Sequence, residues 1–258
     1  MMKVVIISIG NELLRGRTVN TNATEIGQKL TLAGNEVYRG LTVQDNETEI
    51  SWAINQAMAV ADLIVTTGGL GPTYDDITVQ SIAKALGLKL IEDPRALEII
   101  KKKYSALGVE LTSERLKMAF IPEGARIIEN RVGTAPGLEV KFNGKIILIL
   151  PGVPNEARSI LEVILPELTD PSIFVIDTSK FYSGMMESQV APLISDIMKK
   201  SSGNVYIKTH PRNSESRKPA IEVEIVARGK NREEAEMLSD QIFNEISNFI
   251  KGKDKKSN

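Results

Sequence analysis

The strongest constraint on the fold is a regular alternation of strand and helix patterns over the first third of the chain. Short apolar runs typical of buried strands occupy residues Lys3–Ile9, 37–43 and 62–66. Each run is followed by a helical pattern, at residues 22–32, 47–60 and 76–86. Because strands that alternate with helices of this length form right-handed βαβ units, the sequence predicts an α/β fold with a parallel sheet.

Local signals mark where several elements begin and end. The residues Asn22-Ala-Thr-Glu25 match a capping box and predict the start of the first helix. Asp93-Pro94 predicts the start of a helix that runs to about residue 107, and a short helix is expected after Ser113. Asn143-Gly144 predicts a hairpin between two strands, so an antiparallel strand joins the sheet. A further helix is expected after Pro154.

The order of elements changes after residue 168, which predicts a second domain. Residues 1–168 form the predicted first domain and residues 173–250 the second. The second domain reads as a β-α-β-β-α module, with strands at 173–182, 205–209 and 220–227 and helices at 187–200 and 232–249. The last residues, 251–258, are predicted to form a disordered tail.

Composition excludes several classes of protein and site. The 258 residues contain no cysteine and one histidine, His210, which excludes disulfides, thiolate nucleophiles and a multi-histidine metal site. A net charge of −1 gives no overall attraction to nucleic acid. No run of 18 apolar residues predicts a membrane span, and the N-terminus lacks the apolar core of a signal peptide, so we expect a cytoplasmic protein.

A glycine-rich segment, T-T-G-G-L-G-P-T-Y-D-D at residues 66–76, follows the third predicted strand. Its three glycines can turn backbone N–H groups toward an anion. The segment matches neither the dinucleotide fingerprint nor the P-loop, and a tight turn explains the glycines almost as well. Asp75 and Asp76 would repel a phosphate unless a divalent cation bridged them, although each could also be a helix cap.

Other polar residues follow the first two strands and a later one. Carboxyl ends of parallel strands meet at one edge of a sheet, where ligands bind, so these residues are expected to converge. We predict Glu12, Asp45 and Asp76 as catalytic residues, and Asp45, Asp75 and Asp76 as metal ligands. The predicted ligand-binding residues are Gly10, Asn11, Asn20, Asn22, Thr67, Gly68, Gly69, Gly71, Pro72, Thr73, Pro151, Gly152 and Val153. Capping is the main explanation of Asn20 and Asn22, whose side-chain amides could also bind a ribose or base.

Four motifs resemble those of the competence/damage-inducible CinA family. They are I-G-N-E-L-L-R-G-R-T-V-N-T-N-A at residues 9–23, T-T-G-G-L-G-P-T-Y-D-D-I-T at 66–78, G-T-A-P-G at 133–137 and P-G-V-P-N-E at 151–156. The resemblance implies a first domain of the molybdopterin-binding MoaB/Mog-like type, a three-layer α/β sandwich with a mostly parallel sheet. It also implies a small KH-like α+β domain after it, without the nicotinamide-nucleotide amidase domain of many relatives.

The resemblance implies a nucleotide or pterin ligand, and three functions stay open. The first is hydrolysis of ADP-ribose or a related dinucleotide, dependent on a divalent metal such as Mg, Mn or Co, with Glu12 orienting the attacking water. The alternative is binding or adenylylation of molybdopterin, for which relatives use acids that match Asp45 and Asp76. The third, nucleic-acid binding by the KH-like domain, is disfavoured because residues 201–204 read S-S-G-N instead of the GXXG loop. Association into a homo-oligomer is also expected.

Overall fold

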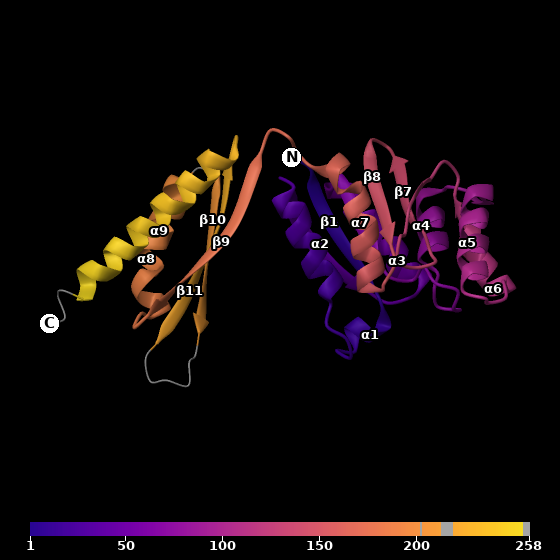
Figure 1. The fold of residues 1–258 in the computed structure, drawn as a ribbon, viewed down its shortest axis with the longest axis horizontal. Coiled ribbons are helices and arrows are strands. Elements are labelled where there is room, and N and C mark those ends of the chain that lie inside the picture. The colour runs from indigo at the N-terminus through magenta and orange to yellow at the C-terminus, as the bar shows by residue number, and fades with distance from the viewer. Residues whose placement is uncertain (202, 213–218, 255–258) are drawn as a thin grey trace. The chain divides into compact units, whose positions relative to one another are not determined.

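The structure is a computed structural model that describes residues 1–201, 203–212 and 219–254. The chain divides into two compact units (Figure 1). The first comprises Met1–Thr31 and Asn35–Thr169, and the second comprises Leu32–Gly34 and Asp170–Asn258. Each unit has its own buried core.

A six-stranded sheet in the order β2-β1-β3-β8-β7-β6 forms the centre of the first unit. β1, β2, β3 and β8 run parallel, while β7 and β6 pair antiparallel at one side. The predicted mostly parallel α/β fold is therefore confirmed. The strands are β1 (Lys3–Ile9), β2 (Glu36–Val43), β3 (Leu63–Thr67), β6 (Arg126–Ile128), β7 (Gly137–Phe142) and β8 (Lys145–Leu150).

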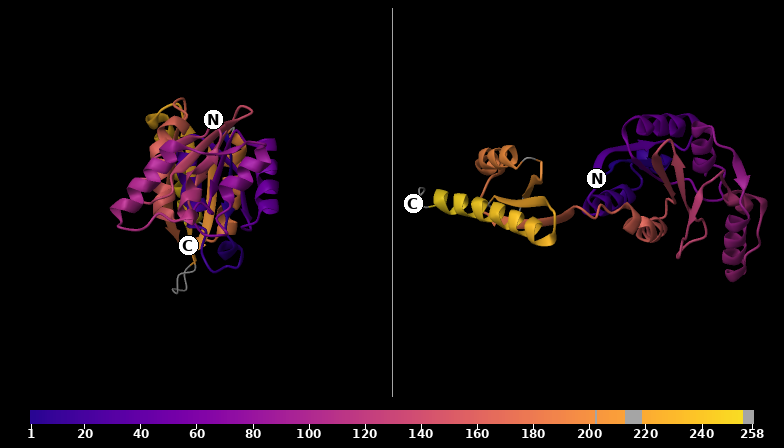
Figure 2. Two further views of the ribbon diagram at one scale, coloured as in Figure 1. Left: turned by 90° about the vertical axis from the view of Figure 1, so that its right-hand side faces the viewer. Right: turned by 90° about the horizontal axis from the view of Figure 1, so that it is seen from above.

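Helices cover both faces of this sheet, which makes three layers (Figure 2). Alternate residues of β1 enter two separate cores: Val5 and Ile7 pack with α3 (Glu47–Val60) and α4 (Thr78–Leu86). Val4 and Ile6 pack with α2 (Thr21–Leu32) and α7 (Pro154–Leu168) on the other face. Burial on both faces explains why β1 reads as an unbroken apolar run, and each such side chain contributes roughly 1.5–3 kcal/mol.

Several short elements lie between the predicted ones. A four-residue helix, α1 (Asn11–Leu14), follows β1 in what the sequence presents as a loop. β4 (Leu90–Glu92) and β5 (Phe120–Pro122) pair antiparallel in a small separate sheet. Between them lie three helices, α5 (Pro94–Ala106), α6 (Ser113–Leu116) and the 3₁₀ helix η1 (Lys117–Ala119). Strands and helices of three or four residues are too short for a periodic pattern to reveal.

The second unit is a three-stranded antiparallel sheet with two helices. Its strands pair in the order β10-β11-β9, and alternate residues of β11, including Val223 and Ile225, are buried with Phe243 of α9. The elements are β9 (Phe174–Ser183), α8 (Glu187–Lys200), β10 (Val205–Arg212), β11 (Ala220–Gly229) and α9 (Arg232–Asp254).

The C-terminal helix of the second unit is longer than the sequence predicts. The helix α9 continues to Asp254, so the first residues of the predicted tail are helical instead of disordered. Residues 255–258 lie outside the described residues, and so does Ser202 of the S-S-G-N segment.

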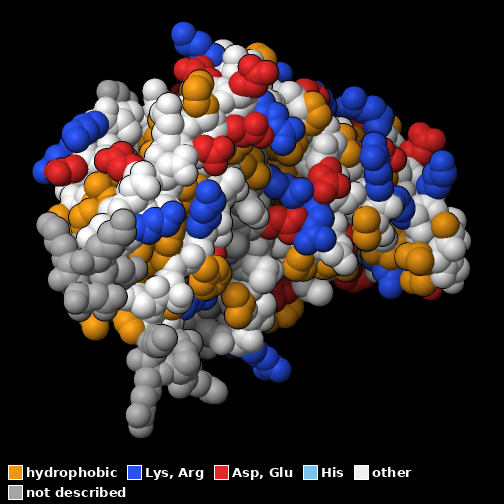
Figure 3. All heavy atoms as spheres, turned by 60° about the vertical axis from the view of Figure 1, so that its left-hand side comes forward, with side chains coloured by type: hydrophobic (Ala, Val, Ile, Leu, Met, Phe, Trp, Pro, Cys, Tyr) orange, Lys and Arg blue, Asp and Glu red, His pale blue; other side chains and the backbone are white. Residues whose placement is uncertain are grey.

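No described helix is both long and apolar enough to cross a membrane. On the face drawn in Figure 3, acidic and basic side chains are interspersed.

Candidate functional site

A cavity of about 250 Å³ lies beyond the carboxyl ends of β1, β2 and β3. We call it the rim cavity. It brings together most residues that the sequence predicts for the site: Glu12, Asn20, Asn22, Asp45, Thr67, Gly68, Gly69, Thr73, Asp75, Asp76 and Gly152. The other predicted ligand-binding residues do not line it: Gly10, Asn11, Gly71, Pro72, Pro151 and Val153. The predicted convergence of strand ends thus holds for the acids and for two of the three glycines.

Two glycines permit the turn between β3 and α4. Gly68 has φ 110°, and a Cβ added there would lie 2.0 Å from the carbonyl oxygen of Ile9. Gly69 has φ 67°, and a Cβ there would lie 2.2 Å from Oγ1 of Thr78. Both positions therefore require glycine for backbone conformation and for close packing. Thr78 also donates its hydroxyl hydrogen to the carbonyl oxygen of Gly68, at 2.8 Å, which fixes the turn against α4.

The next backbone amides in this turn have no partner. The N–H groups of Gly69, Leu70 and Gly71 donate no hydrogen bond to any residue that the structure describes. Leu70 is only 7% exposed, so the side chain is buried although these donors are free. Gly69 and Gly71 are half-buried, and successive free amides in such a turn are able to bind an anion.

The acids beside this turn do not cap α4. The helix begins at Thr78, its N-cap residue is Ile77, and no side chain caps it, so the predicted start at Asp76 is wrong. Instead, the carboxylate of Asp76 accepts the backbone N–H of Thr73 at 2.8 Å. The hydroxyl of Thr73 lies within hydrogen-bonding distance of both Asp75 and Asp76. These contacts close the turn and leave other carboxylate lone pairs available to a ligand.

Asp45 is the acid that the site perturbs most clearly. Burial raises the pKa of Asp45, the backbone N–H of Asn11 opposes that rise, and the nearby carboxylates of Glu12 and Asp75 add to it. The Asn11 N–H lies 2.7 Å from Oδ2 of Asp45. Among the described residues, none of the four acids Glu12, Asp45, Asp75 and Asp76 forms an ion pair. The rim cavity therefore collects uncompensated negative charge.

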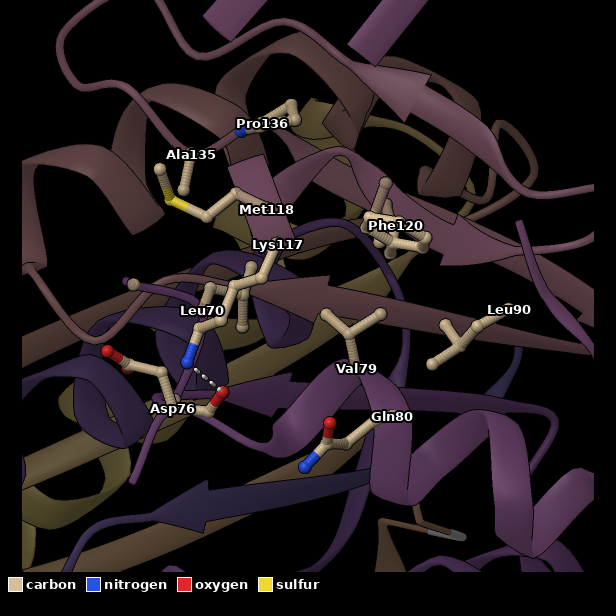
Figure 4. A pocket seen from close by; sticks show the side chains of 13 residues that line it. Leu70, Asp76, Val79, Gln80, Leu90, Lys117, Met118, Phe120, Ala135 and Pro136 are labelled. Carbon is tan, nitrogen blue, oxygen red and sulfur yellow. Dashed lines mark hydrogen bonds between the residues drawn. The ribbon is translucent and has the colours of Figure 1, made fainter. Parts of the chain in front are cut away.

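Lys117 also contacts this turn, and the sequence does not predict that contact. Its Nζ donates to the backbone carbonyl oxygens of Thr73 and of Asp76, the latter at 3.1 Å (Figure 4). Lys117 belongs to η1, and η1 leads directly into β5. Lys117 lies 41 residues after Asp76 in the sequence, so this contact has no local signal, and the pairing of β5 with β4 accompanies it.

The two asparagines after α1 hold the rim together. The predicted capping box at Asn22 is wrong: the carbonyl oxygen of the Asn20 side chain accepts the N–H of Ala23 at 3.1 Å, so Asn20 caps α2. The Asn22 side-chain amide donates to Oγ1 of Thr67 and to the carbonyl oxygen of Gly152, both at 2.8 Å. The donor hydrogens of Asn22 are thus used to join α2, β3 and the turn after β8.

The acids do not assemble a complete metal site by themselves. In the described parts of the chain, no three Asp, Glu, His or Cys side chains are arranged to hold a metal ion. The trio Asp45, Asp75 and Asp76 therefore lacks the geometry of a protein-only cage. Mg²⁺, in contrast, is usually held by one or two carboxylates together with phosphate oxygens of a substrate, and two unpaired acids beside an anion site fit that donor set.

Comparison with known proteins gives this site a family. Residues 5–170 match the family model described as "Probable molybdopterin binding domain". A protein of Caldivirga maquilingensis is 49% identical over 233 residues, which cover 90% of this chain and 91% of that protein. Protein Ta0487 of Thermoplasma acidophilum is 47% identical over 231 residues, which cover 90% of this chain and 89% of that protein.

A solved structure agrees with these relatives. The crystal structure of the protein CinA, of unknown function, from Thermoplasma acidophilum is similar with a TM-score of 0.62 and 51% identity. The similarity covers 64% of this chain and 97% of that one. Since the family model spans nearly all of the first unit and the relatives extend into the second, the chain belongs to the probable molybdopterin binding domain family, as a CinA-like member.

Proposed function

We propose that the first unit binds a phosphorylated pterin of the molybdopterin class at the rim cavity. The observation that carries this proposal is the run of three free amides at Gly69, Leu70 and Gly71, next to that cavity. A phosphate is the natural acceptor for such a run. The family description supports the pterin part of the proposal.

Lys117 and the acids supply the remaining electrostatics. The Lys117 ammonium is held at the turn by two carbonyl oxygens, so its charge is available to offset a bound phosphate. A divalent cation between Asp45 or Asp75 and the phosphate would relieve the repulsion among these acids. Mg, Mn and Co all accept such oxygen-rich ligand sets. The cation would polarise the phosphate and position it for reaction.

One observation favours a second function, hydrolysis of the pyrophosphate in ADP-ribose or a related dinucleotide. The carboxylate of Glu12 lies over Gly10, where an added Cβ would be 2.4 Å from Oε1, and it has no ion pair among the described residues. Glu12 also lies close enough to Asp45 to raise its pKa. A free carboxylate beside the proposed cation can orient a water and accept its proton.

Calorimetry with the full chain separates these functions. We expect molybdopterin to bind in the presence of Mg²⁺, and its dephosphorylated pterin to bind at least about 100-fold more weakly, because the amides lose their charged acceptor. Equal affinity for both compounds would overturn the phosphate assignment. Incubation with ATP and molybdopterin tests adenylylation.

Incubation with ADP-ribose and Mg²⁺, Mn²⁺ or Co²⁺ tests hydrolysis through the release of AMP. Glu12→Gln should then abolish AMP release while molybdopterin affinity stays unchanged, since Gln keeps the size of the side chain but cannot accept the proton. AMP release without loss in Glu12→Gln would remove Glu12 from the mechanism. Absence of AMP with every metal and dinucleotide would remove the hydrolytic function.

A further inference from the structure

The six-stranded sheet of the first unit has a free edge at β2. This strand is the last in the sheet order, and among the described strands only β1 pairs with it. Five of its eight residues are exposed, and they include Val37, Tyr38 and Arg39. An edge strand keeps backbone N–H and C=O groups that can pair with a strand of another chain. β2 is therefore a surface at which a further strand can join the sheet.

Both ends of β2 face β1. The N–H of Glu36 donates to the carbonyl oxygen of Met2 at 2.9 Å, and the carbonyl oxygen of Val43 accepts the N–H of Gly10 at 3.1 Å. In a regular strand, two residues an odd number of positions apart would turn their backbone groups to opposite sides. Glu36 and Val43 face the same side because β2 contains a bulge at Tyr38, which has no partner in β1.

The bulge determines which backbone groups of β2 are free. Val37 follows Glu36 before the bulge, so its N–H and C=O turn away from β1. After the bulge, the alternation that ends at Val43 turns the groups of Gly40 and Thr42 outward. Two antiparallel copies of β2 can therefore exchange hydrogen bonds between Val37 of each copy and Gly40 of the other. A Cβ added at Gly40 would have no atom within 4 Å, so this approach is open.

The same register matches a ring with a cation. When Val37 lies opposite Gly40, Tyr38 of each copy lies opposite Arg39 of the other, next to the two-fold axis. Within one chain the Arg39 guanidinium already lies 4.9 Å from the centroid of the Tyr38 ring, and Nζ of Lys3 lies 4.4 Å from it. A second Arg39 beside this ring adds a cation–π contact across the axis.

The register also matches an acid with a base. Glu36, Arg39 and Leu41 point to one face of the sheet, because their partners are alternate residues of β1. Glu36 lies opposite Leu41 of the other copy and is therefore a diagonal neighbour of its Arg39. Neither Glu36 nor Arg39 forms an ion pair with a described residue. The acid of one copy is thus available to the base of the other.

A cavity of about 150 Å³ lies beside this edge. Trp52 of α3 lines it, is the only tryptophan of the chain and is 50% exposed. Tryptophan, tyrosine and arginine are the residue types that most often supply the binding energy of protein interfaces. A strand paired with β2 covers Trp52 and closes the open side of this cavity. The lining residues are Val5, Arg39, Leu41, Trp52, Gln56 and Ala57.

We propose that β2 forms the interface of a homodimer, in which the β2 strands of two copies pair antiparallel about a two-fold axis and join two six-stranded sheets into one. A second copy is the occupant because one short segment supplies both members of every pair: donor and acceptor, ring and cation, acid and base. Such self-complementarity is what a two-fold interface requires. The sequence motifs imply association without assigning a surface to it. No residue of β2 lines the rim cavity, so the interface does not depend on the ligand.

The first test follows the mass of the full chain by light scattering after size-exclusion chromatography. We expect twice the mass of one chain, and a blue shift of Trp52 emission over the concentration range in which the dimer forms. Gly40→Pro removes an N–H that points away from β1, a position at which an edge strand tolerates proline. It should weaken association at least about 10-fold, because two symmetry-related hydrogen bonds are lost.

Thr42→Pro is the matched control for Gly40→Pro. Thr42 also turns its N–H outward and is exposed. In the proposed register it lies opposite Asn35 of the other copy, which precedes β2 and whose N–H is already bonded to Leu30. Association should therefore be unchanged in Thr42→Pro.

Charge reversal tests the register. Glu36→Arg and Arg39→Glu should each weaken association about 10-fold, because like charges then meet across the axis. The double variant, Glu36→Arg with Arg39→Glu, should recover part of this loss, because opposite charges face each other again. Glu98→Arg, at an exposed acid of α5 without an ion pair among the described residues, is the control.

Every result supports or overturns this interface. A monomer at all concentrations overturns it and leaves the edge of β2 to a strand of another protein. A dimer that forms without a shift of Trp52 emission, or that persists unchanged in Gly40→Pro, uses another surface and overturns it as well. Equal losses in Gly40→Pro and Thr42→Pro, or a double variant as weak as the single ones, contradict the register. Recovery in the double variant supports it, since a misfolded chain cannot recover in this way.

Discussion

Charged side chains are arranged in opposite ways at two places in this protein, the sheet of the second unit and the rim cavity of the first. On the sheet of the second unit they satisfy one another: Nε2 of His210 lies 2.7 Å from Oε2 of Glu224, and Arg212 pairs with Glu222. Ser179 donates a further hydrogen bond to Glu222 at 2.7 Å. In the rim cavity of the first unit, by contrast, none of the four acids forms an ion pair with a described residue, and the N–H groups of Gly69, Leu70 and Gly71 beside it have no described acceptor.

The difference is visible in the acids themselves. The Arg212 guanidinium and the Ser179 hydroxyl hold the pKa of Glu222 below its usual range, whereas burial raises the pKa of Asp45. A lowered pKa means that the folded state favours the charged acid, and a raised pKa means that it does not. The charges around Glu222 thus hold the sheet of the second unit, whereas the acids of the rim cavity have no ion pair and can interact with a ligand. Four experiments can break or sharpen this contrast.

The largest effect is expected from Asp76→Asn. Asn keeps an acceptor for the Thr73 N–H but loses the charge, so Mg²⁺-dependent affinity for 6-hydroxymethylpterin diphosphate should fall at least about 100-fold with the fold intact. Calorimetry and circular dichroism measure the two properties. Glu224→Gln, which removes a paired acid of the second unit, should leave affinity unchanged. Equal losses in both variants would erase the distinction between the units.

The second effect concerns the backbone of the rim. Gly69→Ala should destabilise the first unit by about 3 kcal/mol, because the new Cβ would meet Thr78 in a left-handed conformation. Gly87→Ala is a matched control with φ 68° and no atom within 4 Å, so it should cost only about 1 kcal/mol. Trp52, the single tryptophan, lies in α3 and reports unfolding of the first unit by fluorescence. Similar losses would show that crowding at Gly69 carries no cost.

Removal of the charge of Lys117 should have a smaller effect. Lys117→Met keeps most of the aliphatic side chain and should weaken pyrophosphate binding about 10-fold, the equivalent of about 1.4 kcal/mol. Lys180→Met is the control, because Nζ of Lys180 lies over the ring of Phe243 in the second unit. Affinity measured at two salt concentrations should depend on salt less in Lys117→Met than in the control. Identical behaviour would place Lys117 outside the site.

The smallest expected effect is a change in stability when a single acid is neutralised, and it has opposite signs for Asp45 and Glu222. Because the pKa of Asp45 is raised in the folded state, its contribution to stability is present at low pH and is lost as pH rises through that pKa. Asp45→Asn should therefore stabilise the ligand-free first unit at about pH 7, by less than about 1 kcal/mol, with no gain at about pH 3.

Glu222→Gln should do the reverse. The pKa of Glu222 is lowered, so its contribution is present above its unfolded pKa and is lost as pH falls through the folded one. The variant should be less stable than the unmodified protein at neutral pH and equal to it in acid. Trp52 fluorescence follows the first unit, and hydrogen exchange of β11 amides follows the second. Shifts of the same sign would contradict the contrast.

The elements that sequence predicted well are those whose pattern is local. β1 and β3 are buried on both faces and therefore read as apolar runs. The hairpin between β7 and β8 turns at Asn143 and Gly144, which both have positive φ as this turn requires. The convergence of Glu12, Asp45 and Asp76 followed from parallel strand order alone.

The parts that sequence missed depend on contacts between distant residues. The expected capping box is wrong because Asn20 caps α2, and Glu25 instead pairs with Arg158 of α7, 133 residues away. The Arg158 guanidinium also lowers the pKa of Glu25. The contact of Lys117 with the glycine turn has no signal in the sequence for the same reason, because Lys117 lies 41 residues after Asp76.

The contacts of the Asn22 side chain limit the order in which the first unit can fold during synthesis. Its amide bonds to Thr67, 45 residues on, and to Gly152, 130 residues on. A nascent chain can pair β1 with β2 and β3 soon after synthesis, but it cannot close the rim until β8 and the following turn have left the ribosome. Closure of the rim cavity is therefore a late event in the synthesis of the first unit, because it needs the chain up to Gly152.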